Sequence, residues 1–376
     1  MSARARNLTA QGHDVINLSV GEPNFSPPDF VLGAAKKAID DGHHYYTPVS
    51  GYLELREEVC KKFLRDNRLN YKPSQIVIST GGKQSLINIF LALINPGDEI
   101  IIPAPYWVSY YEMASLCEAR QVIIPTTLQT DFKISPESLE NAITSRSKIF
   151  IFSSPCNPSG SIYSRKELKY LSEVFAKHPQ LMIISDEIYE HINYLDTYTS
   201  IAEFPEVYEQ TVTVNGLSKA FAMTGWRIGY IGAPEWLAQI CEKIQGQTTS
   251  GANSIAQKAA ISALKASYEK ISYMINTFKK RRDMVLEEIS NIPGFHSNIP
   301  QGAFYIFPDV SDLFGKTFSG VRISNSDDLA MYLLNHAHVA TVGGGPFGDE
   351  NCIRISYASS EENLKEAFAR IRRMLS

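Results

Sequence analysis

The chain has 376 residues, of which 44% are apolar and 20% are charged, an ordinary balance for a globular protein. A formal net charge of −4 leaves no electrostatic case for binding nucleic acid. No apolar run approaches the roughly 18 residues that a membrane-spanning helix needs, so we expect no membrane partner. The length exceeds what one hydrophobic core usually serves, which predicts a large domain and a smaller one.

The cysteines and histidines argue against two further classes of protein. Five cysteines are scattered along the chain, an odd number that fits a reduced, cytoplasmic protein better than a disulfide framework. The N-terminus is positively charged but has no apolar core behind it, so we do not expect a secretory signal. The close histidine pairs have no acidic or cysteine companions at ligand spacing, and we therefore expect no metal site.

From about residue 75, short apolar runs alternate with helical patterns. The runs that predict strands are rich in β-branched residues and cover 75–80, 98–105, 120–126, 147–155, 180–187, 210–216 and 227–234. Helical patterns cover 83–94, 106–118 and 164–178, the last with Ser164 as N-cap and Glu167 three residues later. The alternation predicts a mostly parallel sheet with helices on both faces, in which ligands bind beyond the carboxyl ends of the strands.

The C-terminal part shows a different pattern. A long helical region from about Ile255 to Ile289 ends the α/β unit. Strand patterns near 302–307 and 352–358, followed by a last helix, predict a separate α+β unit. The segment before Pro23 is too short to fold alone, and we expect it to pack on that unit. The predicted domains are residues 23–289 and, together, residues 1–22 with 290–376.

Glycines and an aromatic residue follow two of the predicted strands. Gly81 and Gly82 open a helix, where free backbone N–H groups and the helix dipole suit an anion such as phosphate. A plain tight turn explains the two glycines as well. Trp107 follows the next strand, and its ring either belongs to the core or stacks on a flat ligand.

Polar groups at later strand ends indicate one ligand site. Asn157 lies between two prolines in a rigid turn. Asp186 leaves a buried strand, where a carboxylate needs a cationic partner, and Tyr189 follows three residues later. Lys219 and Arg227 lie among small and apolar residues in "VNGLSKAFAMTGWRIGY". Either both cations are solvated, or their partner is an anion that is not part of the chain.

Pyridoxal phosphate is the cofactor that requires these groups together. Its aldehyde forms a Schiff base with a lysine, and its pyridinium nitrogen needs an acidic or basic partner. Its phenolate oxygen accepts hydrogen bonds, and its phosphate needs donors. The residues therefore predict pyridoxal 5′-phosphate as the cofactor.

The same motifs carry a family resemblance over essentially the whole chain. "YYTPVSG", "GGKQSL", "PYWVSY", "CNPSG", "SDEIYE", "SKAFAMTGWRIGY" and "RISYA" occur in this order. The chain resembles the fold-type I, class I aminotransferases of the aspartate aminotransferase superfamily, and most closely their bacterial aspartate/prephenate branch. The resemblance implies an α/β fold whose large domain has a mostly parallel seven-stranded sheet, with a smaller α+β domain.

The resemblance also implies roles for the cofactor-binding residues. Lys219 would carry the Schiff base, and Asp186 would pair with the pyridinium nitrogen. Tyr189 and Asn157 would hold the phenolate oxygen, so that the catalytic set is Lys219, Asp186 and Tyr189. Trp107 would stack on the ring. The groups around the phosphate would be Gly81, Gly82, the backbone of Lys83, Arg227 and, from the neighbouring subunit, Tyr46.

Further residues would bind the substrate. By the resemblance, Arg354 would clamp the α-carboxylate, with Gly21, Asn157 and Trp107 beside it. Lys83 would reach the distal carboxylate of a dicarboxylic substrate. Without the family, Arg354 is equally well interpreted as a surface strand residue. Lys83 is then a solvated lysine, although a cation in the first turn of a helix opposes the helix dipole.

Two departures from the family pattern affect these expectations. Many relatives carry an additional N-terminal arm that helps to cover the substrate, so active-site closure is less well defined for this chain. Gly216 stands where more distant relatives use a serine hydroxyl on the phosphate, while the closer branch shares the glycine. We therefore expect the phosphate site to lose one donor and to be otherwise intact.

The resemblance implies ping-pong transamination between aspartate or glutamate and 2-oxoglutarate or oxaloacetate, in a homodimer whose two sites share residues. The alternatives are an aminotransferase for aromatic or other amino acids and a pyridoxal-phosphate-dependent β-lyase. Lys83 argues against the β-lyase. A cofactor-binding regulatory protein is a third alternative, but such proteins usually carry a DNA-binding domain, for which this chain lacks both the basic patch and the length.

Overall fold

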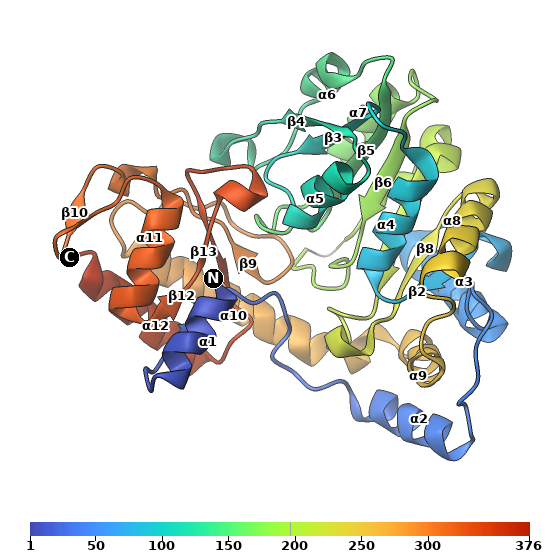
Figure 1. Ribbon diagram of the computed structural model, residues 1–376, viewed down its shortest axis with the longest axis horizontal. Coiled ribbons are helices and arrows are strands. Elements are labelled where there is room, and N and C mark those ends of the chain that lie inside the picture. Colours follow the sequence, from blue (N-terminus) through green and yellow to red (C-terminus); the bar gives the residue numbers. More distant parts are fainter. Residues whose placement is uncertain (196) are drawn as a thin grey trace.

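A seven-stranded sheet forms the centre of the larger part of the molecule (Figure 1). The computed structural model describes residues 1–195 and 197–376. The strand order is β2-β8-β7-β6-β5-β3-β4, with β8 antiparallel to both neighbours and the other pairs parallel. The mostly parallel, seven-stranded sheet expected from the resemblance is therefore confirmed. Its strands are β2 Ile76–Ser79, β3 Glu99–Pro103, β4 Arg120–Ile124, β5 Ser147–Ser153, β6 Met182–Asp186, β7 Thr211–Gly216 and β8 Gly229–Gly232.

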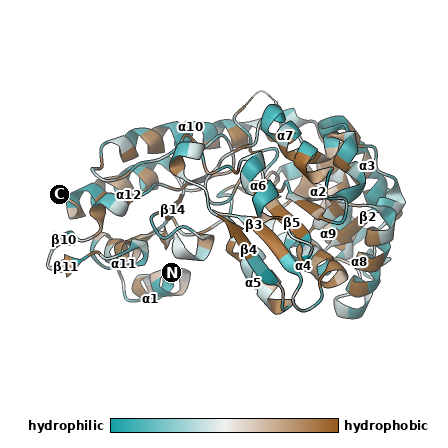
Figure 2. Ribbon diagram, turned by 90° about the horizontal axis from the view of Figure 1, so that it is seen from above, coloured by the Kyte–Doolittle hydropathy of each residue, from teal (hydrophilic) through white to brown (hydrophobic). Residues whose placement is uncertain are grey.

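The central strands are apolar on both faces because each face has its own core. In β3, Ile100 and Ile102 enter one apolar cluster, and Ile101 enters another. In β5, Ile149 and Phe150 are likewise divided between the two clusters. This alternation turns the continuous apolar runs of the sequence into strands that are covered on both faces. In Figure 2, β3, β4 and β5 are largely brown and lie between helices.

Helices cover both faces of the sheet. α4, α5 and α8 contribute to one apolar cluster, whereas α3, α6 and α7 pack on the opposite face. α7 begins as predicted, because Ser164 Oγ accepts a hydrogen bond from the backbone N–H of Glu167 and forms a capping box. The bounds are α3 Leu53–Asn67, α4 Gly82–Leu93, α5 Val108–Leu116, α6 Pro136–Ala142, α7 Arg165–Phe175 and α8 Glu235–Thr248.

The helical region predicted from Ile255 to Ile289 is two helices, α9 Ser254–Lys265 and α10 Ser272–Ser290. The helix ends at Ala266, whose backbone is extended with ψ 147°, and a short 3₁₀ turn follows. The break lets the two helices bury their apolar faces in different places. α9 packs on α2 (Asp29–Asp40) and α3, whereas α10 packs on the C-terminal helix α12 (Glu361–Met374).

The C-terminal part is built on a three-stranded antiparallel sheet in the order β13-β14-β9. The N-terminal segment joins it, because β1 pairs in parallel with β12 and α1 packs beside it (Figure 1). The remaining bounds are α1 Ser2–Ala10, β1 Ile16–Asn17, β9 Tyr305–Ile306, β10 Thr317–Phe318, β11 Val321–Arg322, α11 Ser326–Tyr332, β12 Val339–Ala340, β13 Val342–Gly343 and β14 Ile353–Ser356.

The N-terminal segment thus packs on the C-terminal unit as expected, while the exact domain boundaries at residues 22/23 and 289/290 stay predictions. Within the described residues, no helix has both the length and the apolar content to cross a membrane.

Candidate active site

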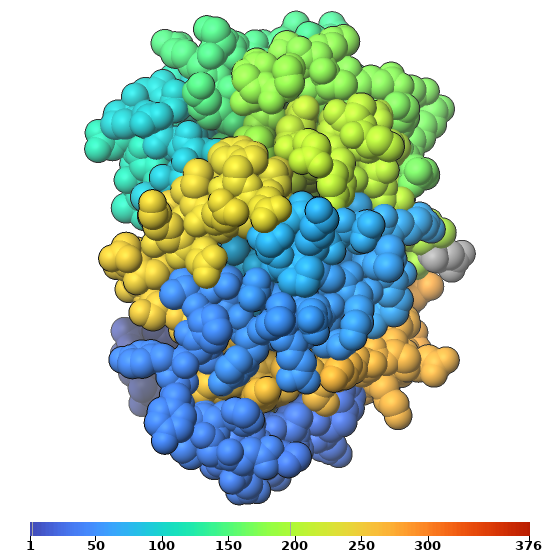
Figure 3. Space-filling view, turned by 90° about the vertical axis from the view of Figure 1, so that its right-hand side faces the viewer, coloured from blue at the N-terminus to red at the C-terminus, as the bar shows by residue number. Residues whose placement is uncertain are grey.

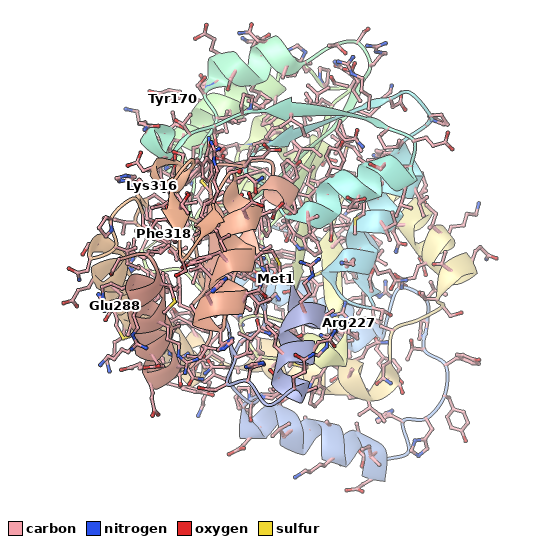
Figure 4. The ribbon with its side chains drawn as sticks, turned by 60° about the vertical axis from the view of Figure 1, so that its left-hand side comes forward. Met1, Tyr170, Arg227, Glu288, Lys316 and Phe318 are labelled. Atoms are coloured by element: carbon pink, nitrogen blue, oxygen red, sulfur yellow. The ribbon has the colours of Figure 1, made fainter. Side chains whose placement is uncertain are left out.

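One cavity of about 860 Å³ lies between the carboxyl ends of β5, β6 and β7 and the C-terminal sheet. Figure 4 labels two of its lining residues, Met1 and Arg227, near the middle of the molecule. The cavity brings together most of the residues expected in the site, because parallel strands end at one edge of the sheet. They are Gly21, Gly82, Lys83, Trp107, Asn157, Asp186, Tyr189, Lys219, Arg227 and Arg354.

Two expected residues do not line this cavity. Gly81 lies directly behind its wall, with a φ of 83°, and a Cβ at this position would overlap the guanidinium of Arg227. The positive φ favours glycine at this position, and a larger residue would also displace the guanidinium of Arg227. The side chain of Tyr46 is 98% exposed on the surface of the chain, so within one subunit it contributes nothing to the cavity.

Asp186 ends β6 as a buried carboxylate. Its oxygens accept hydrogen bonds from the hydroxyl of Tyr110 (2.7 Å) and from the backbone N–H of Ile188 (3.2 Å). Burial raises the pKa of Asp186 to about 6, and the positive charge of Lys219 opposes this only weakly. A carboxylate held in this way can accept a cationic partner from outside the chain.

Lys219 follows β7 and faces the same space. Its Nζ donates a hydrogen bond to the carbonyl oxygen of Gly21 (2.6 Å) and lies 5.8 Å from the ring centre of Tyr189. Burial lowers the pKa of Lys219 to about 8. A sizeable fraction of this amine is therefore neutral, and thus nucleophilic, near neutral pH.

Arg354 is buried on β14. Its Nη1 donates to the side-chain oxygen of Asn157 (3.0 Å), and its Nη2 donates to the carbonyl oxygen of Ser19 (2.7 Å). Its Nε is also buried, but it has no hydrogen-bond partner among the described residues. A buried donor without a partner is costly, so this guanidinium is suited to an incoming carboxylate. The alternative of a surface strand residue is wrong.

A second cation and an aromatic ring form another wall. Lys83 Nζ lies 4.8 Å from the ring centre of Trp107, which also packs edge-on against Tyr110. Burial, and to a lesser degree the charge of Arg227, lower the pKa of Lys83. Lys83 is thus a partly buried cation beside another cation, and this arrangement suits an anionic ligand.

The start of α4 and Arg227 form an anion cradle. The first two backbone N–H groups of this helix, those of Gly82 and Lys83, bond no backbone carbonyl among the described residues, whereas those of Gln84 and Ser85 bond that of Gly81. A Cβ at Gly229 would overlap the backbone of Gly81 and Gly82, so the strand packs closely under the cradle. A Cβ at Gly216 would lie 2.8 Å from the carbonyl oxygen of Ile228, so a serine at this position would require the backbone to shift.

These groups fit the parts of pyridoxal phosphate. The anion cradle matches the phosphate, the buried Asp186 carboxylate matches a ring nitrogen, and the partly neutral Lys219 amine matches the aldehyde. Trp107 offers an aromatic face for the ring. These residues match the cofactor by chemical type, and they line one cavity.

Two site tyrosines were not predicted from the sequence. Tyr110 donates to Asp186, and Tyr305 bonds Tyr189 and lines the cavity. Tyr110 stands three residues after Trp107, in the first turn of α5, and this closeness in sequence was a usable signal. Tyr305 lies far from the other site residues in the sequence, and only the fold brings it to them.

One group of potential metal ligands lies outside the cavity. Asp66, Glu190 and His191 place one ligand atom each within 4.8 Å of one another. Lys62, which is fully buried, forms ion pairs with both carboxylates. Positive charge is thus already provided by the chain, and we assign no metal to this cluster.

The comparisons with known proteins agree with this geometry. The family model for aminotransferase class I and II matches residues 13–371. The chain is 48% identical to the bifunctional aspartate aminotransferase and glutamate/aspartate-prephenate aminotransferase of Petunia hybrida, over 99% of its own length and 79% of the relative's. It is 47% identical to the aspartate/prephenate aminotransferase of Cereibacter sphaeroides, over 98% of its length and 93% of the relative's.

Solved structures are similar over the whole chain. The aspartate aminotransferase of Rhizobium meliloti matches with a TM-score of 0.97 and 41% identity, over 100% of this chain and 94% of that one. The aspartate aminotransferase of Thermus thermophilus with maleate matches with a TM-score of 0.94 and 38% identity, over 100% of this chain and 95% of that one.

Proposed function

Because the chain belongs to the class I and II aminotransferases, we propose that it transfers an amino group between aspartate or glutamate and a 2-oxo acid. Pyridoxal phosphate is the proposed cofactor. The observation that carries the proposal is the convergence of Lys219, Asp186 and Arg354 on one cavity. When bound, pyridoxal phosphate supplies an aldehyde for the amino group and a ring that takes up the electrons of the broken Cα–H bond.

In this proposal, different residues of the cavity bind different parts of the cofactor. Asp186 would pair with the ring nitrogen and would favour its protonated form, as a nearby anion does. Tyr189 and Asn157 would donate hydrogen bonds to the phenolate oxygen, and Trp107 would stack on the ring. Arg227 and the N-terminus of α4 would hold the phosphate.

Lys219 is the proposed acid and base of the reaction. Its free amine would take the proton from Cα of the bound substrate and would then give it to the carbon of the cofactor that carried the aldehyde. The pKa of about 8, lowered by burial, suits both steps near neutral pH. In the cofactor-free protein, the hydrogen bond to the Gly21 carbonyl holds this amine in the cavity.

Arg354 and Lys83 support a dicarboxylic substrate. Arg354 has an unpartnered buried Nε for the α-carboxylate, and Lys83 presents a second cation to the same cavity. The Petunia hybrida and Cereibacter sphaeroides relatives are named for aspartate, and the Thermus thermophilus structure holds maleate, a dicarboxylate.

Absorbance of the cofactor-loaded protein tests the proposal. Adding aspartate or glutamate alone should convert the visible band of the cofactor, because the first half of a ping-pong reaction needs no acceptor. Adding 2-oxoglutarate after aspartate should restore the band. A band that aspartate and glutamate leave unchanged would overturn the assignment.

The same assays separate the alternatives. Release of pyruvate and ammonia from a cysteine conjugate, without any 2-oxo acid acceptor, would indicate a β-lyase. A higher kcat/KM for phenylalanine than for aspartate would indicate an aromatic aminotransferase. Lys83 supports the aspartate assignment, because neither phenylalanine nor a cysteine conjugate needs a second cation of this kind.

We further propose a homodimer with shared sites and a cytoplasmic location. The extreme exposure of Tyr46, a residue expected at the phosphate, supports the dimer. All five cysteines are unpaired, which supports a reducing compartment.

A further inference from the structure

Tyr305 is a buried tyrosine of the cavity wall to which the family resemblance assigned no role. It begins β9, is 1% exposed and lines the same cavity as Lys219 and Arg354. Its hydroxyl oxygen lies 2.8 Å from the hydroxyl oxygen of Tyr189. It therefore touches one of the groups that we place at the cofactor.

The ring of Tyr305 contacts the group that we place at the substrate. The guanidinium carbon of Arg354 lies 4.7 Å from the ring centre of Tyr305 and 4.8 Å from that of Phe347. Aromatic faces at this distance attract a guanidinium and limit its tilt. The two hydrogen bonds of Arg354, to Asn157 and Ser19, fix its position within its own plane.

The sheet register holds the two side chains together. Tyr305 of β9 is paired with Ser356 of β14, and Arg354 stands two residues before Ser356. Alternate residues of a strand share a face, and diagonal neighbours on that face are within reach of long side chains. Backbone pairing therefore keeps the ring beside the guanidinium.

Gly21 makes room for the hydroxyl. A Cβ at Gly21 would lie 2.6 Å from the hydroxyl oxygen of Tyr305, so any larger residue would displace it. The carbonyl of the same glycine accepts the hydrogen bond from Lys219. The Tyr305 hydroxyl thus lies between the segment that holds Lys219 and the Tyr189 hydroxyl.

We propose that Tyr305 is a positioning residue that serves both halves of the site: its hydroxyl orients Tyr189 toward the cofactor, and its ring orients Arg354 toward the substrate carboxylate. The proposal rests on the proposed function. If Tyr189 gives its hydrogen to a cofactor oxygen, Tyr305 must be the donor between the two hydroxyls. Burial raises the pKa of both phenols, which keeps both hydrogens in place at neutral pH.

Two substitutions separate the hydroxyl from the ring. Tyr305→Phe removes only the hydroxyl. Without this donor, Tyr189 donates a weaker hydrogen bond to the cofactor oxygen. The deprotonated form of that oxygen is then less stabilised. The pH midpoint of the visible absorbance of the cofactor-loaded protein should therefore rise by about half to one pH unit. The dissociation constant for maleate should change less than about twofold, because the ring still contacts Arg354.

Tyr305→Leu removes the ring as well. Loss of the contact with the guanidinium should weaken maleate binding, measured by calorimetry, by about 5- to 30-fold. Tyr357→Phe is the matched control, because Tyr357 is fully buried and its hydroxyl also bonds a tyrosine, Tyr194, but it does not line the cavity. The control should change neither the midpoint nor the maleate affinity.

Each outcome decides one part of the proposal. An unshifted midpoint in Tyr305→Phe overturns the role of the hydroxyl. Equal maleate affinity in the Phe and Leu variants overturns the role of the ring. The Phe variant decides the first role even if Tyr305→Leu does not fold. If the unmodified protein shows neither a cofactor band nor maleate binding, the proposed function fails, and this result differs from both.

Discussion

Burial favours the neutral forms of Lys219 and Asp186, the two central charged groups of the cavity. It therefore shifts their pKa values in opposite directions. It lowers the pKa of Lys219 to about 8 and raises that of Asp186 to about 6. Both shifts have burial as their largest cause. The two groups lie in one cavity, but neither pKa shift is removed by the other group, because neither group forms an ion pair with any residue that the structure describes.

The lowered pKa of Lys219 can be measured directly in the cofactor-free protein. Only a neutral amine reacts with an acylating reagent, so labelling of Lys219 should increase with pH around a midpoint near 8. In urea-unfolded protein the midpoint should lie near about 10.4, the value for an unperturbed lysine. Peptide mass spectrometry after short pulses gives both curves. The same midpoint in both states would show that the cavity does not desolvate this amine.

Lys83 determines substrate choice in our proposal, and its surroundings give the reason. It is partly buried beside Arg227 and contacts a ring, so a distal carboxylate would relieve the repulsion between two cations. Lys83→Ala should lower kcat/KM for aspartate about 10- to 150-fold, the loss of one hydrogen bond to a charged group. The kcat/KM values for alanine and phenylalanine, which lack that carboxylate, should change little.

The control for this substitution is Lys316→Ala. Lys316 is exposed in the C-terminal part, and Figure 4 labels it well away from Arg227. It should leave kcat/KM for all four amino acids, aspartate, glutamate, alanine and phenylalanine, unchanged. An equal fall for charged and uncharged donors in Lys83→Ala would mean that this lysine only shapes the anion cradle.

At the scale of elements, the end of β6 and the turn that follows it carry acids that face two different surroundings. Asp186 faces the cavity, whereas Glu187 and Glu190 face a buried network with Lys62 and Asn67. Lys62 is fully buried, and its Nζ donates to the side-chain oxygen of Asn67 (2.7 Å). The segment that presents Asp186 is thus anchored from behind by charges on α3. Removing one partner of such a network is strongly destabilising.

Glu187 gives this network a measurable pH dependence. Burial and the charge of Glu190 raise the pKa of Glu187 to about 8, so the folded protein keeps a proton that the unfolded chain has released above about pH 4.3. Stability contributed by this group is therefore lost as the pH rises from about 4.3 to 8. Glu187→Gln has the shape of the neutral acid and does not titrate. Its stability relative to the unmodified protein should rise by about 1–4 kcal/mol between pH 5 and pH 8.

Urea unfolding of both cofactor-free proteins at pH 5, 6.5 and 8 checks this prediction. Glu209→Gln is the control, because Glu209 is exposed in the same part of the molecule. Its unfolding midpoint should follow that of the unmodified protein at every pH. If the stability of Glu187→Gln also changes with pH in parallel with that of the unmodified protein, Glu187 is ionised in the folded state.

The strands were predictable because their apolar runs must be buried on both faces, and the polar strand ends followed from parallel topology. Asp186 and Lys219 were therefore found by their position after a strand. The break at Ala266 was not predictable, because the apolar spacing continues across it and only the packing of α9 and α10 in different places requires it. The place of Tyr305 in the site was not predicted for a related reason, because its contacts cross between the two parts of the chain.

At the scale of the whole molecule, exposed aromatic residues gather on one loop. Tyr45 is 84% and Tyr46 is 98% exposed. The loop itself is anchored, because Gln245 Nε2 donates to the carbonyl oxygen of Val49 and Ser254 Oγ donates to that of His43. In Figure 3 the N-terminal blue segments lie beside the yellow residues of α8 and α9 on this side of the molecule. Two large rings on a fixed loop are expected to be covered by a partner, and a second copy of the chain is the partner that we propose.

A mixed dimer tests whether Tyr46 completes the partner's site. Lys219→Ala should lower turnover by at least about 10²–10⁴, the contribution of a general acid and base. Tyr46→Phe should weaken cofactor binding about 10- to 150-fold, the loss of one hydrogen bond to a phosphate. Both homodimers should therefore be nearly inactive at a cofactor concentration that just saturates the unmodified protein.

If Tyr46 acts across the interface, a dimer of one Tyr46→Phe chain and one Lys219→Ala chain contains both lesions in one site and none in the other. It should then recover about half of the unmodified activity, as expected for one intact site of two in a symmetric dimer. If Tyr46 acts within its own chain, each site carries one lesion and the mixed dimer stays as inactive as its parents. Light scattering must show a dimer throughout, and a fully active monomer would exclude shared sites altogether.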